Sequence, residues 1–109
     1  MNKERMDMIS EMLKKNPDDS FLRYAAALEH KKAGEDEIAI DLLEELIRKS
    51  PDYLAAYYQI GKLFESKGQA HIAIRHYKAG KELATKANDK KTLGELSEAL
   101  LILDADEEF

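Results

Sequence analysis

Hydrophobic positions follow a helical period along most of the chain. Residues 3–15 and residues 92–103 each place four apolar side chains at helical spacing, so that they share one face of a helix. These side chains are Met6, Ile9, Met12 and Leu13 in the first segment, and Leu93, Leu96, Leu100 and Leu103 in the last. The segments 20–53 and 54–87 each hold two further helical patterns separated by a glycine. The pattern predicts six helices and an all-α fold.

The two central segments are related by a repeat of 34 residues. Five residue types recur at this distance: Pro17 and Pro51, Tyr24 and Tyr58, Gly34 and Gly68, Ala39 and Ala73, and Ile40 and Ile74. We expect each glycine to end a helix and reverse the chain, because it adopts a positive φ without strain. Each alanine should let two helices approach closely. The segment 54–87 is thus a second copy of the unit in 20–53.

A proline precedes the start of each copy by three residues and follows a residue that commonly caps helices. In Asn16-Pro17-Asp18-Asp19, we expect Asn16 to be the N-cap and Pro17 the first helical residue, followed by acids that favour the helix dipole. The sequence Ser50-Pro51-Asp52 repeats this signal 34 residues later.

The second copy resembles the tetratricopeptide repeat. Offsets 4, 7, 8, 11, 15, 20 and 24 of its 34-residue frame hold Tyr57, Ile60, Gly61, Phe64, Gly68, Ala73 and Tyr77. The resemblance covers most of the chain and implies an α-α superhelix, a right-handed solenoid, as in small bacterial members of this family. The first copy departs from the family pattern with Arg23, Ala27 and His30 at offsets 4, 8 and 11. We expect its inner seam to pack differently.

The resemblance also implies a division of the single domain, residues 1–109. About three stacked repeats are needed to bury the apolar faces, and only two are complete. The expected parts are an N-terminal half-repeat helix (3–15), a first repeat (20–53), a second repeat (54–87), a capping helix (89–103) and an acidic tail (104–109). Because Thr85 stands where the family has proline, the last helix of the second repeat should continue to about Lys86.

Composition and charge exclude several functional classes. The net charge of −5 argues against nonspecific nucleic-acid binding. No apolar run approaches the length of a membrane span, and no signal peptide is evident, so we expect a cytoplasmic protein without membrane contact. Residues 75–91 hold six basic and two acidic side chains, whereas residues 92–109 hold six acidic and no basic ones. These runs are either solvated surface or a pair of segments whose attraction helps to dock the last helix.

Candidate catalytic and metal-binding residues are scarce. The chain has no cysteine, which excludes thiolate ligands and a cysteine nucleophile. His71 and His76 are five residues apart and cannot share a metal as an i, i+4 pair could, and His30 belongs to the other repeat. We expect His30 to pack at the seam, and His71 and His76 to lie on the surface. The sequence predicts no enzyme, no metal site and no cofactor.

The resemblance implies a binding surface. In the first helix of each tetratricopeptide repeat, offsets 2, 5, 9 and 12 face the concave groove. Here these positions, together with the neighbouring Gln59, are Phe21, Tyr24, Leu28, Lys31, Ala55, Tyr58, Lys62 and Glu65. The Lys and Asn of the family's chaperone-tail clamp would occupy positions 24 and 28, so that clamp is absent.

This surface predicts a noncatalytic adaptor that binds a protein or peptide, such as an amphipathic helix with apolar anchors. Two alternatives remain. In one, Tyr24, Leu28 and Tyr58 are covered by the chain's own N-terminal or capping helix. In the other, the protein is a homodimeric, self-associating module with no external peptide ligand.

Overall fold

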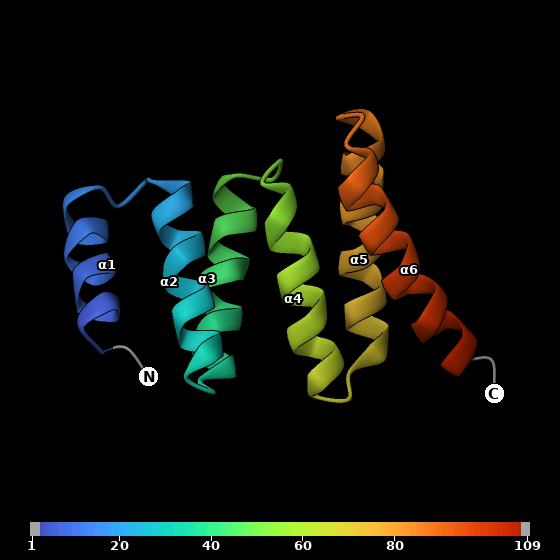
Figure 1. The fold of residues 1–109 in the computed structure, drawn as a ribbon, viewed down its shortest axis with the longest axis horizontal. Helices are drawn as coiled ribbons and strands as arrows, with labels where there is room; N and C mark the ends of the chain where they lie inside the picture. Colours follow the sequence, from blue (N-terminus) through green and yellow to red (C-terminus); the bar gives the residue numbers. More distant parts are fainter. Residues whose placement is uncertain (1–2, 108–109) are drawn as a thin grey trace. The chain divides into compact units, whose positions relative to one another are not determined.

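The computed structural model describes residues 3–107, with side chains described as far as residue 103. Six helices run along this part of the chain, and none of its residues is in a strand. They are α1 (Lys3–Lys15), α2 (Ser20–Lys32), α3 (Asp36–Lys49), α4 (Leu54–Ser66), α5 (Ala70–Lys86) and α6 (Lys90–Glu107) (Figure 1). The predicted all-α fold is confirmed.

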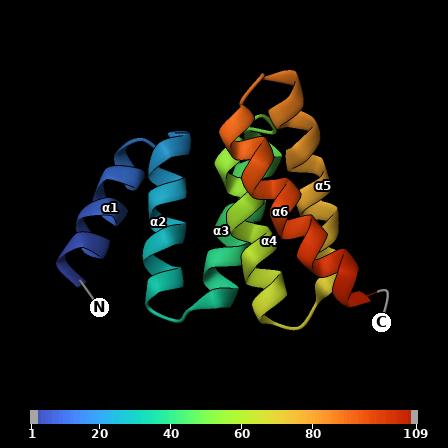
Figure 2. The same cartoon turned by 45° about the vertical axis from the view of Figure 1, so that its right-hand side comes forward.

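The helices belong to two compact units, Met1–Tyr53 and Leu54–Phe109. In the first unit α2 packs against α1 and α3, and in the second unit α5 packs against α4 and α6. Figure 2 shows α6 lying along α5 after the chain reverses. The boundary between the units falls where the sequence predicts the boundary between its two repeats.

Three helices end in the same hydrogen-bonded turn. Gly34 and Gly68 take φ of +78° and +76°, and Asn88 takes the same left-handed conformation with φ of +57°. In the first turn the Gly34 N–H donates to the Lys31 carbonyl and the Glu35 N–H to the His30 carbonyl, and the same two bonds recur after α4 and α5. This is the Schellman motif, which satisfies carbonyls left over at a helix end. The expected conformation of both glycines is confirmed.

The prediction that Asn16 caps α2 is wrong. Asn16 ends α1 instead, since its N–H and its side-chain amide both donate to the Met12 carbonyl. Pro17 lies in a turn closed by the Asp19 N–H and the Asn16 carbonyl, and Asp19 caps α2 by accepting from the Leu22 N–H at 3.0 Å. The fixed φ of proline suits the second position of a turn as well as the first turn of a helix.

The sequence predicts the C-terminal end of α5 correctly and that of α6 incorrectly. Helix α5 continues to Lys86, as Thr85 predicts. Helix α6 continues to Glu107, past the expected end at residue 103. Four of the six residues predicted to form an acidic tail are therefore helical, because no glycine or proline interrupts them, and the last two lie outside the described residues.

The core of the second unit depends on two close approaches between helices. A Cβ on Gly61 of α4 would lie within 2.8 Å of three ring atoms of Tyr77 of α5, so the glycine makes room for the ring. A Cβ on Gly80 of α5 would lie 2.8 Å from the Tyr57 Cβ and 3.1 Å from a methyl of Leu96 in α6. Small residues at these crossings let the three helices share one buried core.

The first unit uses a different pair at the positions equivalent to Gly61 and Tyr77. These positions hold Ala27 and Leu43, and both are buried. Arg23, which replaces the aromatic residue, is also buried and donates from Nη2 to the Pro17 carbonyl at 2.7 Å. The prediction that the first repeat packs differently is therefore confirmed.

Candidate functional site

The most exposed apolar side chains of the first unit gather where α1 meets α2. Phe21 is 65% exposed and Met8 is 63% exposed, and Met12 is exposed beside them. The hollow between the two helices has a volume of about 350 Å³. Its lining residues are Arg5, Met8, Ile9, Met12, Phe21, Leu22, Ala25, Leu28, Glu29 and Lys32. We call this feature the α1–α2 hollow.

Two cations and one carboxylate border this hollow. The Arg5 Nε lies 3.4 Å from Oε1 of Glu29, and the Lys32 Nζ lies 3.9 Å from the same oxygen. The Glu29 side chain is only 8% exposed, whereas those of Arg5 and Lys32 are mostly exposed. The charge that this border presents to solvent is therefore mainly positive.

The residues of α2 that were predicted to face the groove lie in different surroundings. Phe21 and Leu28 line the α1–α2 hollow. Tyr24 is half-buried with its ring centroid 5.3 Å from that of Tyr53, in a tilted aromatic pair. Lys31 is half-buried in the last turn of α2. Phe21 is therefore the most accessible apolar residue of the stripe.

The stripe of α4 contains a linked set of polar and aromatic side chains. The half-buried Tyr58 ring lies 6.1 Å from that of Tyr77, and Lys62 Nζ lies 5.4 Å from the Tyr58 centroid. Tyr77 donates its hydroxyl to Oε1 of Glu65 at 2.8 Å, and that oxygen also lies 3.8 Å from Lys62 Nζ. Burial, followed by the bond to Glu65, raises the pKa of Tyr77. The side chains of this set hold one another in position.

Tyr58 and Lys62 also face α6. They line a hollow of about 220 Å³ together with Glu95, Glu98, Ala99 and Ile102 of that helix. The other two predicted residues of α4 differ in accessibility, because Ala55 is exposed and Gln59 is half-buried. The alternative interpretation expects the chain's own helices to cover Tyr24, Leu28 and Tyr58. All three are half-buried, with Leu28 beside α1 and Tyr58 beside α6, whereas Phe21 is exposed.

The three histidines occupy unlike places. His30 is half-buried, with Nδ1 2.9 Å from Oε1 of Glu35, and His71 is exposed. His76 was predicted to lie on the surface, but it stacks on Phe64 with ring centroids 5.6 Å apart. Burial of the imidazole, reinforced by the charge of Arg75, lowers the pKa of His76. Within the described residues, no group of three or more metal-ligating side chains could hold an ion.

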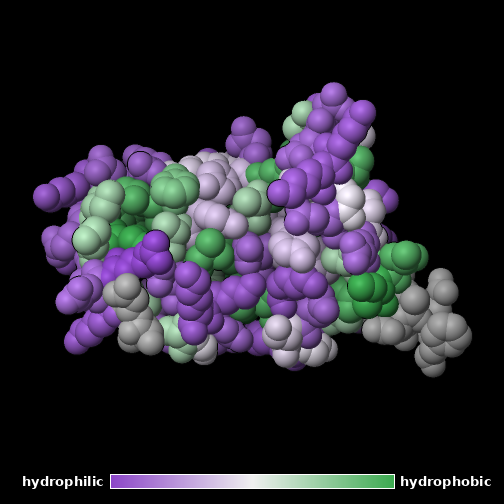
Figure 3. All heavy atoms as spheres, viewed as in Figure 1, coloured by the Kyte–Doolittle hydropathy of each residue, from purple (hydrophilic) through white to green (hydrophobic). Residues whose placement is uncertain are grey.

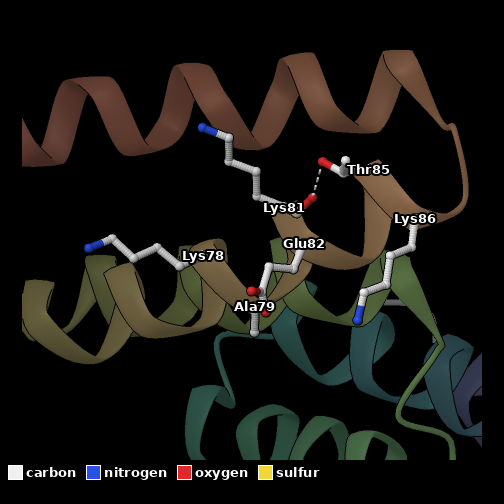
Figure 4. Close-up of a pocket in the computed structure, with 6 residues that line it drawn as sticks. All are labelled: Lys78, Ala79, Lys81, Glu82, Thr85 and Lys86. Carbon is white, nitrogen blue, oxygen red and sulfur yellow. Dashed lines mark hydrogen bonds between the residues drawn. The ribbon is translucent and has the colours of Figure 1, made fainter.

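Another hollow lies along the basic face of α5 and has a volume of about 650 Å³. Its lining residues all come from that helix: Lys78, Ala79, Lys81, Glu82, Thr85 and Lys86. Figure 4 shows the amines of Lys78, Lys81 and Lys86 pointing in different directions, so they do not converge on one ligand. Among the described side chains no ion pair joins α5 to α6, and the helices meet through apolar residues such as Leu96. Lys78, Lys81 and Lys86 of the basic run are exposed to solvent.

The arrangement of paired helices with glycine turns can be compared with known proteins. The family model described as tetratricopeptide repeat matches residues 1–85. The chain belongs to the tetratricopeptide repeat family. A comparison with curated proteins gave no match. The fold of this family is that of a protein–protein interaction module.

Several solved structures resemble the chain closely. A tetratricopeptide repeat domain protein from Salinibacter ruber, solved by NMR, is 40% identical and has a TM-score of 0.78, over 82% of this chain and 90% of that one. The Yersinia enterocolitica type III secretion translocator chaperone SycD is 14% identical with a TM-score of 0.90, over 98% and 74% of the two chains. The TPR2B domain of yeast Sti1, in a complex with pHsp70, is 18% identical with a TM-score of 0.85, over 93% and 81%. The last two show a shared fold.

Sequence reasoning about the tetratricopeptide stripe missed the contribution of α1. Met8 and Arg5 lie outside the apolar stripe predicted for residues 3–15, yet both line the α1–α2 hollow. The spacing of Met8 and Met12 was the available signal, since residues four apart lie on one face of a helix.

Within the described residues, every helix is too short or too polar to span a membrane.

Proposed function

We propose that this tetratricopeptide protein is a noncatalytic adaptor that binds an amphipathic helix or an extended peptide. In the first unit the ligand contacts Phe21, Tyr24, Leu28 and Lys31, with Phe21 as the main apolar contact. In the second unit Ala55, Tyr58, Gln59 and Lys62 supply the equivalent contacts. The adaptor acts in the cytoplasm of a bacterium.

The observation that carries this proposal is the exposure of Phe21. A phenylalanine that is 65% exposed beside an exposed methionine forms an apolar surface that an interaction would cover. Methionine is flexible and polarisable, so Met8 and Met12 can adapt to different apolar ligands. Tyr24 and Tyr58 are held by their aromatic neighbours, which reduces the conformational entropy lost on binding.

Two solved relatives support the two forms of this proposal. The Sti1 domain was solved with pHsp70 bound, which is the precedent for an external ligand. A crystal form of the Yersinia translocator chaperone is described as an alternative dimer, which is the precedent for self-association.

Site-specific photocrosslinking tests the proposal. A photoreactive phenylalanine is placed at position 21, and at position 38 in a control, because Ile38 of α3 is also an exposed apolar residue and lies outside the α1–α2 hollow. Both proteins are irradiated in a lysate of the source organism. We expect a crosslinked partner at position 21 that is absent at position 38, and we expect unlabelled wild-type protein to compete for it.

The products also separate the two forms of the proposal. A crosslink only to a second copy of this chain would support self-association in place of an external ligand. The same set of products at both positions would mean that Phe21 is not part of a specific site, and the proposal would fail.

A further inference from the structure

A second exposed apolar surface lies on α6. Leu101 is 71% exposed and Ile102 is 54% exposed, and both follow the exposed acids Glu95 and Glu98. Glu98 lies one helical turn before both apolar residues, and Glu95 lies two turns before Ile102. Residues 92–109 contain no basic side chain. This surface of α6, part of which borders the hollow shared with Tyr58 and Lys62, is therefore apolar with an acidic border, and we call it the α6 face.

The α1–α2 hollow has the opposite character. Its exposed apolar residues are Met8, Met12 and Phe21, and its border carries the exposed cations Arg5 and Lys32 around the nearly covered Glu29. Figure 3 shows apolar surface over α1 and α2, and again over the end of α6. The two surfaces are complementary in charge, and both are apolar at the centre.

We propose that the α6 face of one copy binds the α1–α2 hollow of a second copy. Leu101 and Ile102 enter the hollow against Met8 and Phe21, while Glu95 and Glu98 face Arg5 and Lys32. This interaction needs no external ligand. It goes beyond the proposed function, because it assigns a second copy of this chain to the α1–α2 hollow, whose Phe21 would also contact an external peptide.

Charge decides between this arrangement and a symmetric one. If two α6 faces paired, Glu95 and Glu98 of one copy would approach the same acids of the other. If two α1–α2 hollows paired, Arg5 and Lys32 would approach their own copies. Like charges brought together at an interface are unfavourable, whereas the pairing of unlike surfaces brings acids to bases.

The pairing of unlike surfaces has a consequence for assembly. A pair of bound copies keeps one hollow and one α6 face available, on different copies. Heterologous contacts of this kind continue into closed rings or open chains and do not stop at a dimer. The mass of the wild-type protein should therefore increase beyond two copies as its concentration rises.

Analytical ultracentrifugation of designed variants tests the proposal. The hollow variant is Met8→Gln with Phe21→Gln, the face variant is Leu101→Gln with Ile102→Gln, and the control is Ile38→Gln, which changes an exposed apolar residue outside both surfaces. Circular dichroism checks that each variant is folded. Masses are measured from about 1 μM to 1 mM, where small interfaces associate.

We expect the wild-type protein and the control to associate, and each double variant alone to stay monomeric. An equimolar mixture of the two double variants should form a dimer, because the intact α6 face of one fits the intact hollow of the other. That mixture should form nothing larger, since its remaining hollow and face are both disabled. Association should also weaken as NaCl rises from about 0.05 to 0.5 M, because the acidic and basic borders are exposed.

Three results would overturn the proposal: wild-type protein that is monomeric over the whole range, association that survives in either double variant, or a mixture that stays monomeric while the wild type associates. These masses are measured on purified protein without a partner. Failure here would therefore leave the crosslinking test of an external ligand intact, and the reverse also holds.

Discussion

A glycine and an aromatic ring determine the packing of the second unit as a pair. Gly61 has no side chain where a Cβ would collide with the buried Tyr77 ring, and the first unit holds Ala27 and Leu43 at the equivalent positions. In the second unit the smaller residue, glycine, is paired with the larger one, tyrosine. In the first unit the larger alanine is paired with the smaller leucine. At the scale of single residues, the two repeats fill equivalent positions with different combinations of side chains.

A double-mutant cycle tests this interpretation. Gly61→Ala should lower the free energy of unfolding by about 1–3 kcal/mol, because the new methyl overpacks a core that cannot move aside. Tyr77→Leu should also destabilise, since it leaves a cavity and removes the hydrogen bond to Glu65. The double variant recreates the Ala–Leu combination and should be more stable than the sum of the single changes by about 1 kcal/mol or more. Additive effects in urea unfolding would contradict the steric explanation.

His76 makes stability depend on pH in a definite direction. Its pKa in the folded protein is below the ordinary value of 6.5, chiefly because of burial, so the unfolded chain binds the proton more readily. This contribution to stability is complete above about pH 6.5 and is lost progressively as the pH falls below that value. Unfolding free energies at pH 7 and pH 5 should therefore differ more in the wild type than in His76→Gln.

The control for this measurement is His71→Gln, which removes an exposed imidazole from the same helix. If His76→Gln kept the full wild-type pH dependence between pH 5 and pH 7, the stacked histidine would not be its source.

At the scale of elements, the turns fix where the helices end. Gly34, Gly68 and Asn88 close three equivalent turns, and a residue that tolerates a positive φ stands at each one. Asn88 shows that this role does not require glycine, because asparagine enters the left-handed region more readily than other residues with a side chain. The 34-residue repeat therefore predicts the turns at Gly34 and Gly68, whereas the turn at Asn88 has no counterpart among the recurring residues.

Two glycine-to-alanine changes should have opposite effects. Added Cβ atoms at Gly68 and Gly94 would both meet nothing within 4 Å, so neither change causes a collision. Gly68→Ala should destabilise by about 1–2 kcal/mol because of its positive φ. Gly94→Ala should stabilise by about 0.5–1 kcal/mol, because Gly94 is inside α6 and alanine loses less backbone entropy. Thermal unfolding of both variants checks the signs, and a stabilising Gly68→Ala would rule out backbone strain at that turn.

At the scale of the whole molecule, periodicity predicted the fold because helix formation and core burial depend on the same apolar spacing. Ala39, Ala73 and Tyr77 of the repeat frame are all fully buried. The exact caps were less accessible to sequence reasoning, since Asn16 and Asp19 are both good capping residues and only the turn at Pro17 decides between them. The end of α6 was missed because an acidic composition does not by itself stop a helix.

The candidate site could be predicted only where it depends on one helix. The positions of Phe21 and Tyr58 within their repeats follow from the 34-residue frame. Their surroundings do not, because the α1–α2 hollow depends on side chains from a helix that lies outside the complete repeats. The exposure of Leu101 and Ile102 likewise depends on which face α6 turns toward α5.

The close packing of the Tyr77 ring against Gly61 limits which helices can be exchanged between the two units. Because the vacant position lies on α4 and the ring that occupies it lies on α5, neither helix can be exchanged separately for its counterpart from the first unit. A chimera with α2 in place of α4 would bring an alanine against the tyrosine ring, while one with α3 in place of α5 would leave unfilled volume. The unit of duplication, recombination or design is therefore the helical hairpin as a whole.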